Sequence, residues 1–288
     1  MRARYALLLC LVMAFFSLSV AAQPAEKGKK KKHGALYFSW GYNQEWYTRS
    51  TVHVTQSALG NDYELVKVRG NDHMGWNNKS IFRQALTIPQ YNYRLGYFFN
   101  EKQDMAIELN FDHTKYIITQ GQQVRVRGTL AGQPVDKEVT FTEQNGFYYF
   151  LNNGANFFLF NFVKRWGLYR PKNNSFALDL LGKAGVGPVV PHVENKLFGV
   201  ANDPHFQLGG WNTGIETALK LTVLRYGYLE LAQKVDYARY SNLKMAAGGT
   251  GRQAFGTYEL ILSLGFMIPC KPQNPLFAHP QTNIVKQN

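Results

Sequence analysis

Eleven charged residues fall at every second position of segments that are otherwise apolar. They are Arg94, Glu108, Asp112, Asp179, Lys183, Glu216, Lys220, Glu230, Lys234, Asp236 and Glu259. Residues two apart share one face of a β-strand, so each segment would present its charges to one side and its apolar residues to the other. Seven acidic and four basic groups on one side could pair as a polar core, and they could also line a narrow pore.

Histidines are the best candidates for general bases. Acyl-transfer chemistry needs a nucleophilic hydroxyl, a base within hydrogen-bond reach and an acid that orients the base. His113 follows Asp112, and His192 and His205 lie later in the chain, but none stands in a serine–histidine spacing typical of barrel acyltransferases. The sequence therefore predicts no catalytic residues, and we expect no enzyme.

The sequence carries only partial metal and cofactor motifs. The seven histidines contain no pair at the i, i+2 or i, i+4 spacing of a local metal site. Gly182, Gly185 and Gly187 resemble a phosphate loop, but Pro188 follows them in place of a lysine and a helix. We expect no metal and no cofactor, and we interpret these glycines as small residues in a packed strand.

Alternation with a period of two extends over most of the chain after its first 33 residues, which predicts β-strands. We expect eight, near residues 34–43, 90–98, 105–112, 156–164, 176–183, 211–221, 229–237 and 257–263. In the fourth, Phe158, Phe160 and Phe162 are assigned outward and Asn161 inward.

The connections between these strands alternate in length. Short turns are expected near 99–103, 165–174 and 225–227, and long connections near 48–86, 119–152, 188–205 and 242–252. Eight antiparallel strands need three connections on one side and four on the other, which is the count found. The long connections thus lie together, as in outer-membrane barrels.

A spanning sheet must close on itself, because hydrocarbon cannot satisfy backbone N–H and C=O groups. The 17 tyrosines and 20 phenylalanines suit a wall whose outer face meets lipid. We therefore predict an all-β, antiparallel up-and-down transmembrane β-barrel of about eight strands, with charges inside and long extracellular loops.

Three segments carry a resemblance to a known family. GALYFSWGYN, TIPQYNYRLGYFF and TYELILSLGF resemble parts of small bacterial outer-membrane β-barrel proteins, eight-stranded barrels of the OmpA and OmpW type. The resemblance implies a place in the outer membrane, insertion by the barrel-assembly machinery, contact with outer-membrane lipid and lipopolysaccharide, and both ends in the periplasm. One departure is that Phe266 is followed by further chain, whereas such barrels usually end on an aromatic residue.

The two ends of the chain divide into short segments. Residues 1–22 have the basic start, apolar run and small residues of a cleaved signal peptide. Residues 23–33 form a lysine-rich periplasmic leader, 34–268 the barrel and 269–288 a periplasmic tail. Export and the lack of a binding motif argue against a nucleic-acid partner. Cys270 is the one cysteine left after cleavage, so no internal disulfide is expected.

Function is expected in the long connections. Residues 124–127 and 139–141 form two alternating runs around a Gly/Pro turn, which predicts a hairpin, and 63–69 is strand-like. We expect a recognition surface for an anionic glycan or lipopolysaccharide headgroup, formed by Lys67, Arg69, Trp76, Arg125 and Arg127. The leading hypothesis is a structural or surface-binding role. The alternatives are a narrow porin-like channel and, third, a lipid-modifying enzyme.

Overall fold

The computed structural model describes residues 34–73, 90–99, 103–151, 154–173, 175–223 and 226–270, all within one compact unit. The predicted signal peptide, the basic leader, Trp76 and residues 271–288 lie outside the described residues. No helix in the described part of the chain is long and apolar enough to cross a membrane.

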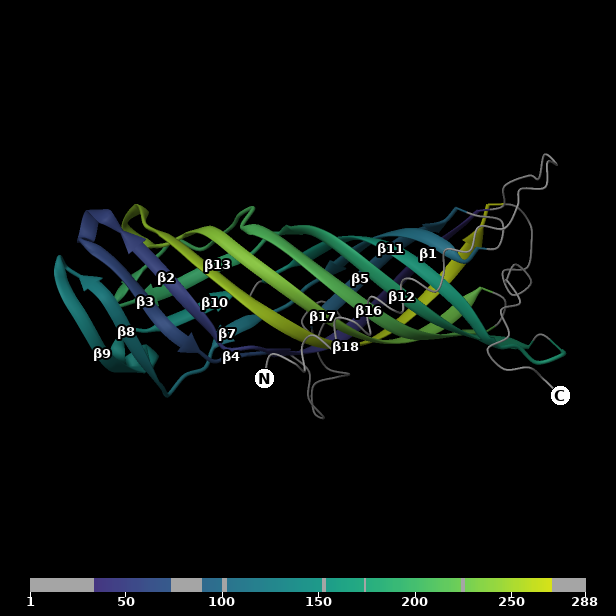
Figure 1. The fold of residues 1–288 in the computed structure, drawn as a ribbon, viewed down its shortest axis with the longest axis horizontal. Coiled ribbons are helices and arrows are strands. Elements are labelled where there is room, and N and C mark those ends of the chain that lie inside the picture. Colours follow the sequence, from purple (N-terminus) through teal and green to yellow (C-terminus); the bar gives the residue numbers. More distant parts are fainter. Residues whose placement is uncertain are drawn as a thin grey trace, which may run out of the picture. The chain divides into compact units, whose positions relative to one another are not determined.

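Eight antiparallel strands form a closed ring (Figure 1). In ring order they are β1 (Ala35–Tyr47), β5 (Tyr91–Phe98), β6 (Met105–Asp112), β11 (Phe157–Tyr169), β12 (Phe176–Val189), β16 (Gly210–Val223), β17 (Gly227–Lys244) and β18 (Thr250–Pro269). The pairing of β1 with β18, from Ala35 opposite Pro269 to Tyr47 opposite Thr257, closes the ring. The fold is therefore an antiparallel, all-β barrel with eight strands in its wall.

The expected turn at 165–174 was too long. β11 continues through Arg165 to Tyr169, so the turn begins only at Arg170. The apolar run before Asn161 obscured the alternation, but the strand keeps its period of two beyond it. Arg165 consequently faces the same side as Asn161, and both are buried.

The long connections are mostly strands and not irregular loops. They hold β2 (Ser50–Gln56), β3 (Asn61–Val68), β4 (Gly70–Asn71), β7 (Tyr116–Ile118), β8 (Gln122–Leu130), β9 (Gln133–Phe141), β10 (Tyr148–Leu151), β13 (His192–Leu197), β14 (Val200–Ala201) and β15 (His205–Phe206), with short 3-10 turns at Ser57–Leu59, Glu143–Asn145 and Ala246–Gly248. We call these strands, with the adjoining ends of β17 and β18, the extension.

Two rows of strands build the extension. β2, β3, β8 and β9 continue the main sheet from the far end of β18, and β4, β7, β10, β13 and β14 form a second sheet, with β15 paired to β13 (Figure 1). The predicted hairpin is confirmed as β8 and β9, and the predicted strand at 63–69 is confirmed as β3.

Along a single strand, the inward-facing side chains are charged in the ring and apolar in the extension. On β17 the charged residues Glu230, Lys234 and Asp236 are buried on the inward face of the ring, and Ala238 and Tyr240 follow them on the same face in the extension. Lipid surrounds the first part, so polar groups are sequestered inside, whereas water surrounds the extension, so apolar groups are sequestered there.

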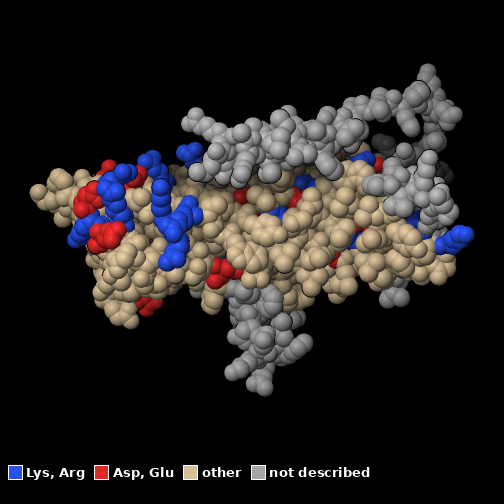
Figure 2. Space-filling view, turned by 60° about the horizontal axis from the view of Figure 1, so that its bottom comes forward, with Lys and Arg blue, Asp and Glu red and all other residues tan. Residues whose placement is uncertain are grey.

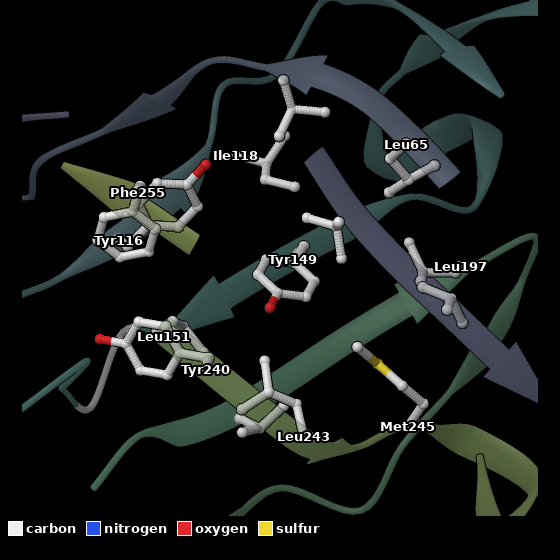
Figure 3. Close-up of a cluster of buried hydrophobic side chains, with 14 of the residues drawn as sticks. Leu65, Tyr116, Ile118, Tyr149, Leu151, Leu197, Tyr240, Leu243, Met245 and Phe255 are labelled. Carbon is white, nitrogen blue, oxygen red and sulfur yellow. The ribbon is translucent and has the colours of Figure 1, made fainter. Parts of the chain in front are cut away.

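An apolar cluster fills the extension, and its side chains point into a common interior (Figure 3). Tyr116, Tyr240 and Phe255 stack on one another, with centroids 4.6 Å apart for Tyr116–Phe255 and 5.4 Å for Tyr240–Phe255. The hairpin contributes Val124 and Phe141. It is therefore part of this core and not a dispensable tip.

Candidate functional sites: the interior ion network and a basic groove

All eleven charged residues singled out from the sequence lie inside the ring, each no more than 4% exposed. Their strands position them by alternation alone, and the cross-strand register then brings opposite charges together. Asp179 lies opposite Lys220, and Lys183 lies opposite Glu216. The structure links most of the eleven through buried ion pairs, in layers along the barrel.

Lys183 is the centre of the middle layer. Its Nζ lies 2.7 Å from Glu230, 2.9 Å from Glu216 and 3.2 Å from Glu108. Glu108 also accepts hydrogen bonds from the Tyr37 hydroxyl at 2.8 Å and from the Asn161 amide at 3.0 Å. One ammonium group therefore neutralises part of the charge on three carboxylates.

Arg94 joins the middle layer to the layer nearer the extension. Its guanidinium lies 2.7 Å from Asp112 and 3.1 Å from Glu216. In the layer nearer the extension, Lys234 pairs with Asp112, with Asp236 at 2.9 Å and with Glu259 at 3.1 Å. Carboxylates outnumber cations in both layers, and each cation is surrounded by acids.

The layer nearest the short turns differs. Here Arg165, which sequence reasoning missed, lies 4.0 Å from Asp179, while Lys220 packs on the ring of Tyr228. Asp179 and Lys220 are buried here as well, and among the described residues no ion pair joins Lys220 to the middle layer. Arg165 could have been found by continuing the alternation of the fourth strand four residues beyond Asn161.

The outer face of the ring is apolar. Ile107, Phe160 and Leu264 expose 60%, 66% and 62% of their surface, and their neighbours around the ring are also large apolar residues. A closed wall with charges inside and hydrocarbon groups outside is stable only in lipid. The fold is a transmembrane β-barrel. Its outward-facing Gln233 has a partner, because the Tyr258 hydroxyl donates to its side-chain oxygen at 3.3 Å.

Comparisons with known proteins agree with this barrel only at the level of fold. No protein-family model and no curated protein matches the chain. Among solved structures, the barrel is similar to Neisserial surface protein A, with 8% identity over 81% of this chain and 96% of the other and a TM-score of 0.33. It is also similar to the outer-membrane protease OmpT from Escherichia coli, with 10% identity over 84% and 99% and a TM-score of 0.35.

A third similar structure is Ail, the attachment invasion locus protein of Yersinia pestis, in complex with the heparin analogue sucrose octasulfate. It shows 12% identity over 83% of this chain and 100% of the other, with a TM-score of 0.29. The assignment of the fold to this chain rests on its own closed ring and apolar belt.

A second candidate site is a basic groove on the outside of the extension. Its volume is about 390 Å³, and β2, β3, β8 and β9 or the segments beside them supply its walls. The groove residues are Arg49, Val66, Lys67, Arg69, Gln122, Gln123, Arg125 and Glu138. Figure 2 shows lysine and arginine side chains gathered at this end of the molecule, while the barrel wall is mostly uncharged.

Local backbone features hold the groove open. Lys67 adopts a left-handed conformation, with φ of 51°, where the β2–β3 register shifts, and this bulge points its side chain outward. The Gln122 amide bonds Arg69 in both directions, donating to its carbonyl at 2.9 Å and accepting from its N–H at 3.0 Å. Arg125 is held by Asp136 through two bonds of 2.6 and 2.7 Å.

The groove contains three of the five residues predicted as a recognition surface: Lys67, Arg69 and Arg125. Arg127 is not part of the lining and pairs with Glu64 at 2.7 Å. Trp76 lies outside the described residues. Arg49 was missed, because it lies in the short break between β1 and β2 and belongs to no alternating run.

The groove lies close to the end of the lipid-facing wall. Trp46 and Tyr258 are cross-strand partners, 47% and 40% exposed, and their ring centroids are 5.7 Å apart. Exposed aromatic pairs of this kind mark the membrane–water interface. Arg49 is only three residues farther along, roughly 10 Å at the rise of a strand.

The three candidate histidines each contact different partners. His113 stacks on Tyr91 and shares a hydrogen bond of 2.9 Å with Asn156, and burial lowers its pKa. The Nδ1 atom of His205 contacts the carbonyl of Asp203, and His192 packs on Phe206. In the described part of the chain, no three His, Cys, Asp or Glu side chains lie close enough to hold a metal ion.

Proposed function

We propose that this outer-membrane barrel is a surface-binding protein that recognises an anionic glycan or glycolipid headgroup in the basic groove. The observation that carries the proposal is the convergence of Arg49, Lys67, Arg69 and Arg125 around one depression. Guanidinium groups pair with phosphate, sulfate and carboxylate through two parallel hydrogen bonds, which suits such ligands.

Three of these cations are available to a ligand. Arg49, Lys67 and Arg69 form no ion pair with any described residue, whereas Arg125 is oriented by Asp136 and has further N–H groups to donate. Only Arg125 is fixed before a ligand binds, so its side chain loses little freedom, while the three unpaired cations supply charge that no described carboxylate neutralises.

The position of the groove favours a ligand in the same membrane. The phosphates of a lipopolysaccharide headgroup lie at the height of the interface, and the groove begins roughly 10 Å beyond the Trp46–Tyr258 pair. We therefore favour a phosphorylated glycolipid of the outer leaflet over a free glycan.

Two observations speak against a channel. The charged side chains of the ring are buried and most of them are held in ion pairs, and the apolar cluster lies beyond them in the extension. An eight-stranded barrel has room for its own side chains and little more. A conductance measurement in planar bilayers tests this alternative directly, and lipid A mass analysis tests lipid modification.

The binding experiment uses the purified barrel in neutral phospholipid nanodiscs. Its ligands are lipopolysaccharide and, in a separate arm, heparin. We expect the triple variant Arg49→Gln, Lys67→Gln and Arg69→Gln to bind lipopolysaccharide at least tenfold more weakly. The control Lys244→Gln, an exposed cation on another strand, should bind normally. Equal affinity of the triple variant and the native protein contradicts the proposal. If the native protein binds heparin but not lipopolysaccharide, the ligand is a free glycan and not a glycolipid.

A further inference from the structure

The layer of the ring interior nearest the short turns has an excess of positive charge. It contains Arg165 from β11 and Lys220 from β16, with Asp179 from β12 as an acid beside them. All three are no more than 1% exposed. Asp104, which is also near Arg165, is paired with Lys164 at 2.6 Å. This composition is the reverse of the other two layers, in which each cation faces several carboxylates.

Arg165 is a buried guanidinium without hydrogen bonds. None of its three nitrogen atoms has a hydrogen-bond partner in the described chain, and the nearest carboxylate oxygen, on Asp179, is 4.0 Å away. The guanidinium carbon lies 4.5 Å from the centroid of the Phe98 ring. A stacked arginine still presents its N–H groups in the plane of the guanidinium, where they can donate to an anion.

Lys220 forms no ion pair with the described residues. Its cross-strand neighbours are Asp179 and Glu230, yet its Nζ pairs with neither, and Glu230 turns to Lys183. The Nζ lies 4.1 Å from the Tyr228 centroid and 5.7 Å from that of Phe98, and it donates to the thioether of Met267 at 3.1 Å. A thioether is a weak acceptor for a buried ammonium group.

Two buried cations, Arg165 from β11 and Lys220 from β16, therefore lie near the ring of Phe98. Burying a charge without a partner is costly, and π faces offset only part of that cost. A second negative charge would balance the layer, and it must be small, because aromatic rings of Tyr37, Phe98 and Tyr228 surround Lys220.

We propose that Arg165 and Lys220 together form a binding site for a small monovalent anion, chloride under ordinary conditions, inside the barrel. The anion accepts from the guanidinium N–H groups and from the ammonium. It ties β11 to β16 across β12, so it acts as a structural ion of the wall. This site is independent of the basic groove.

Bromide locates the site directly. Crystals of the native barrel grown in sodium bromide should give an anomalous peak within hydrogen-bond distance of both Arg165 and Lys220. No peak there, with Arg165 rotated into a two-bond pair with Asp179, overturns the proposal. This measurement needs no variant and is unaffected by any folding defect.

Chloride dependence gives the second test. The folding equilibrium is measured by urea titration in micelles, with chloride replaced by gluconate at constant ionic strength. A single site that is occupied only in the folded state makes the folding constant rise up to tenfold for each tenfold increase in chloride above the Kd. We expect that slope for the native barrel and for the control Lys244→Gln, an exposed cation outside both sites, and a slope near zero for Lys220→Gln. If the folding constant of the native barrel does not depend on the chloride concentration, the proposal is also overturned.

Discussion

Replacement of Lys183 by methionine tests the logic of the interior network. The ammonium group lies within 3.2 Å of three carboxylates, and methionine keeps the length and apolar stem of lysine but removes the charge. Glu216 keeps its pair with Arg94 at 3.1 Å. Glu230 has no other ion pair with the described residues, so it is left buried without a cation.

The expected cost follows from that orphaned carboxylate. Removing one partner of a buried ion pair typically costs about 3–5 kcal/mol. Glu108→Gln is the matched comparison, because Lys183 then keeps Glu216 and Glu230, and Arg94 keeps Asp112 at 2.7 Å. A net loss of about 1 kcal/mol is expected for weakened hydrogen bonds. The two variants should therefore differ by at least about 2 kcal/mol, roughly thirtyfold in the folding constant.

Urea titration of the folded fraction, read by the heat-modifiable mobility of the barrel on gels, measures this difference. Both variants are assayed in the same lipid vesicles, with the native protein alongside. If Glu108→Gln costs as much as Lys183→Met or more, the cation is not the centre of the network. The double variant Lys183→Met and Glu230→Gln should recover part of the loss, because it removes the orphaned charge.

Three further predictions concern the wall, the extension and its exposure. Leu219→Arg places a charge on the lipid face and should reduce insertion by about 2–4 kcal/mol, whereas Leu219→Ala should be much milder; equal folding yields in vesicles would refute the facing of the wall. Burial raises the pKa of the Asp72 carboxyl to about 6. The unfolded chain ionises this group near pH 4, so native stability should fall as the pH rises from about 4 to about 6, and Asp72→Asn should lose that fall in unfolding titrations. Gln133→Cys, at the exposed tip of the β8–β9 hairpin, should react with an impermeant maleimide in intact cells. If this cysteine reacts only after the cells are lysed, the hairpin faces the periplasm and the predicted topology is wrong.

The ring could be predicted from the sequence because its chemistry repeats every second residue. Each strand has one side toward lipid and one toward the interior, so Leu109 and Glu108 reveal their facing by composition alone. The prediction weakened where composition became uniform: the phenylalanine run before Asn161 obscured the alternation, and Arg165 was placed in a turn. The hairpin at 122–141 was visible because its turn residues lie between alternating runs.

The long connections could not be read as a second core from their sequence. Val124 and Phe141 face inward here, although outward-facing apolar residues mark the lipid-facing wall. Alternation shows only that a strand has two unlike faces. Which face is inside depends on whether lipid or water surrounds the strand, and the folded chain decides that.

Sequence alone therefore determined the strands of the ring, their period and the set of charges that must share one face. Tertiary structure alone decided which of those charges meet. Lys183 contacts three carboxylates although only one of its cross-strand neighbours, Glu216, is an acid. Lys220 packs on an aromatic ring although it has an acid on the strand to each side. It also placed Arg49 beside Lys67 and Arg125. Coulomb energies and hydrogen bonds act over a few ångströms between strands distant in sequence, so only the register of the closed ring and its extension could set these partners.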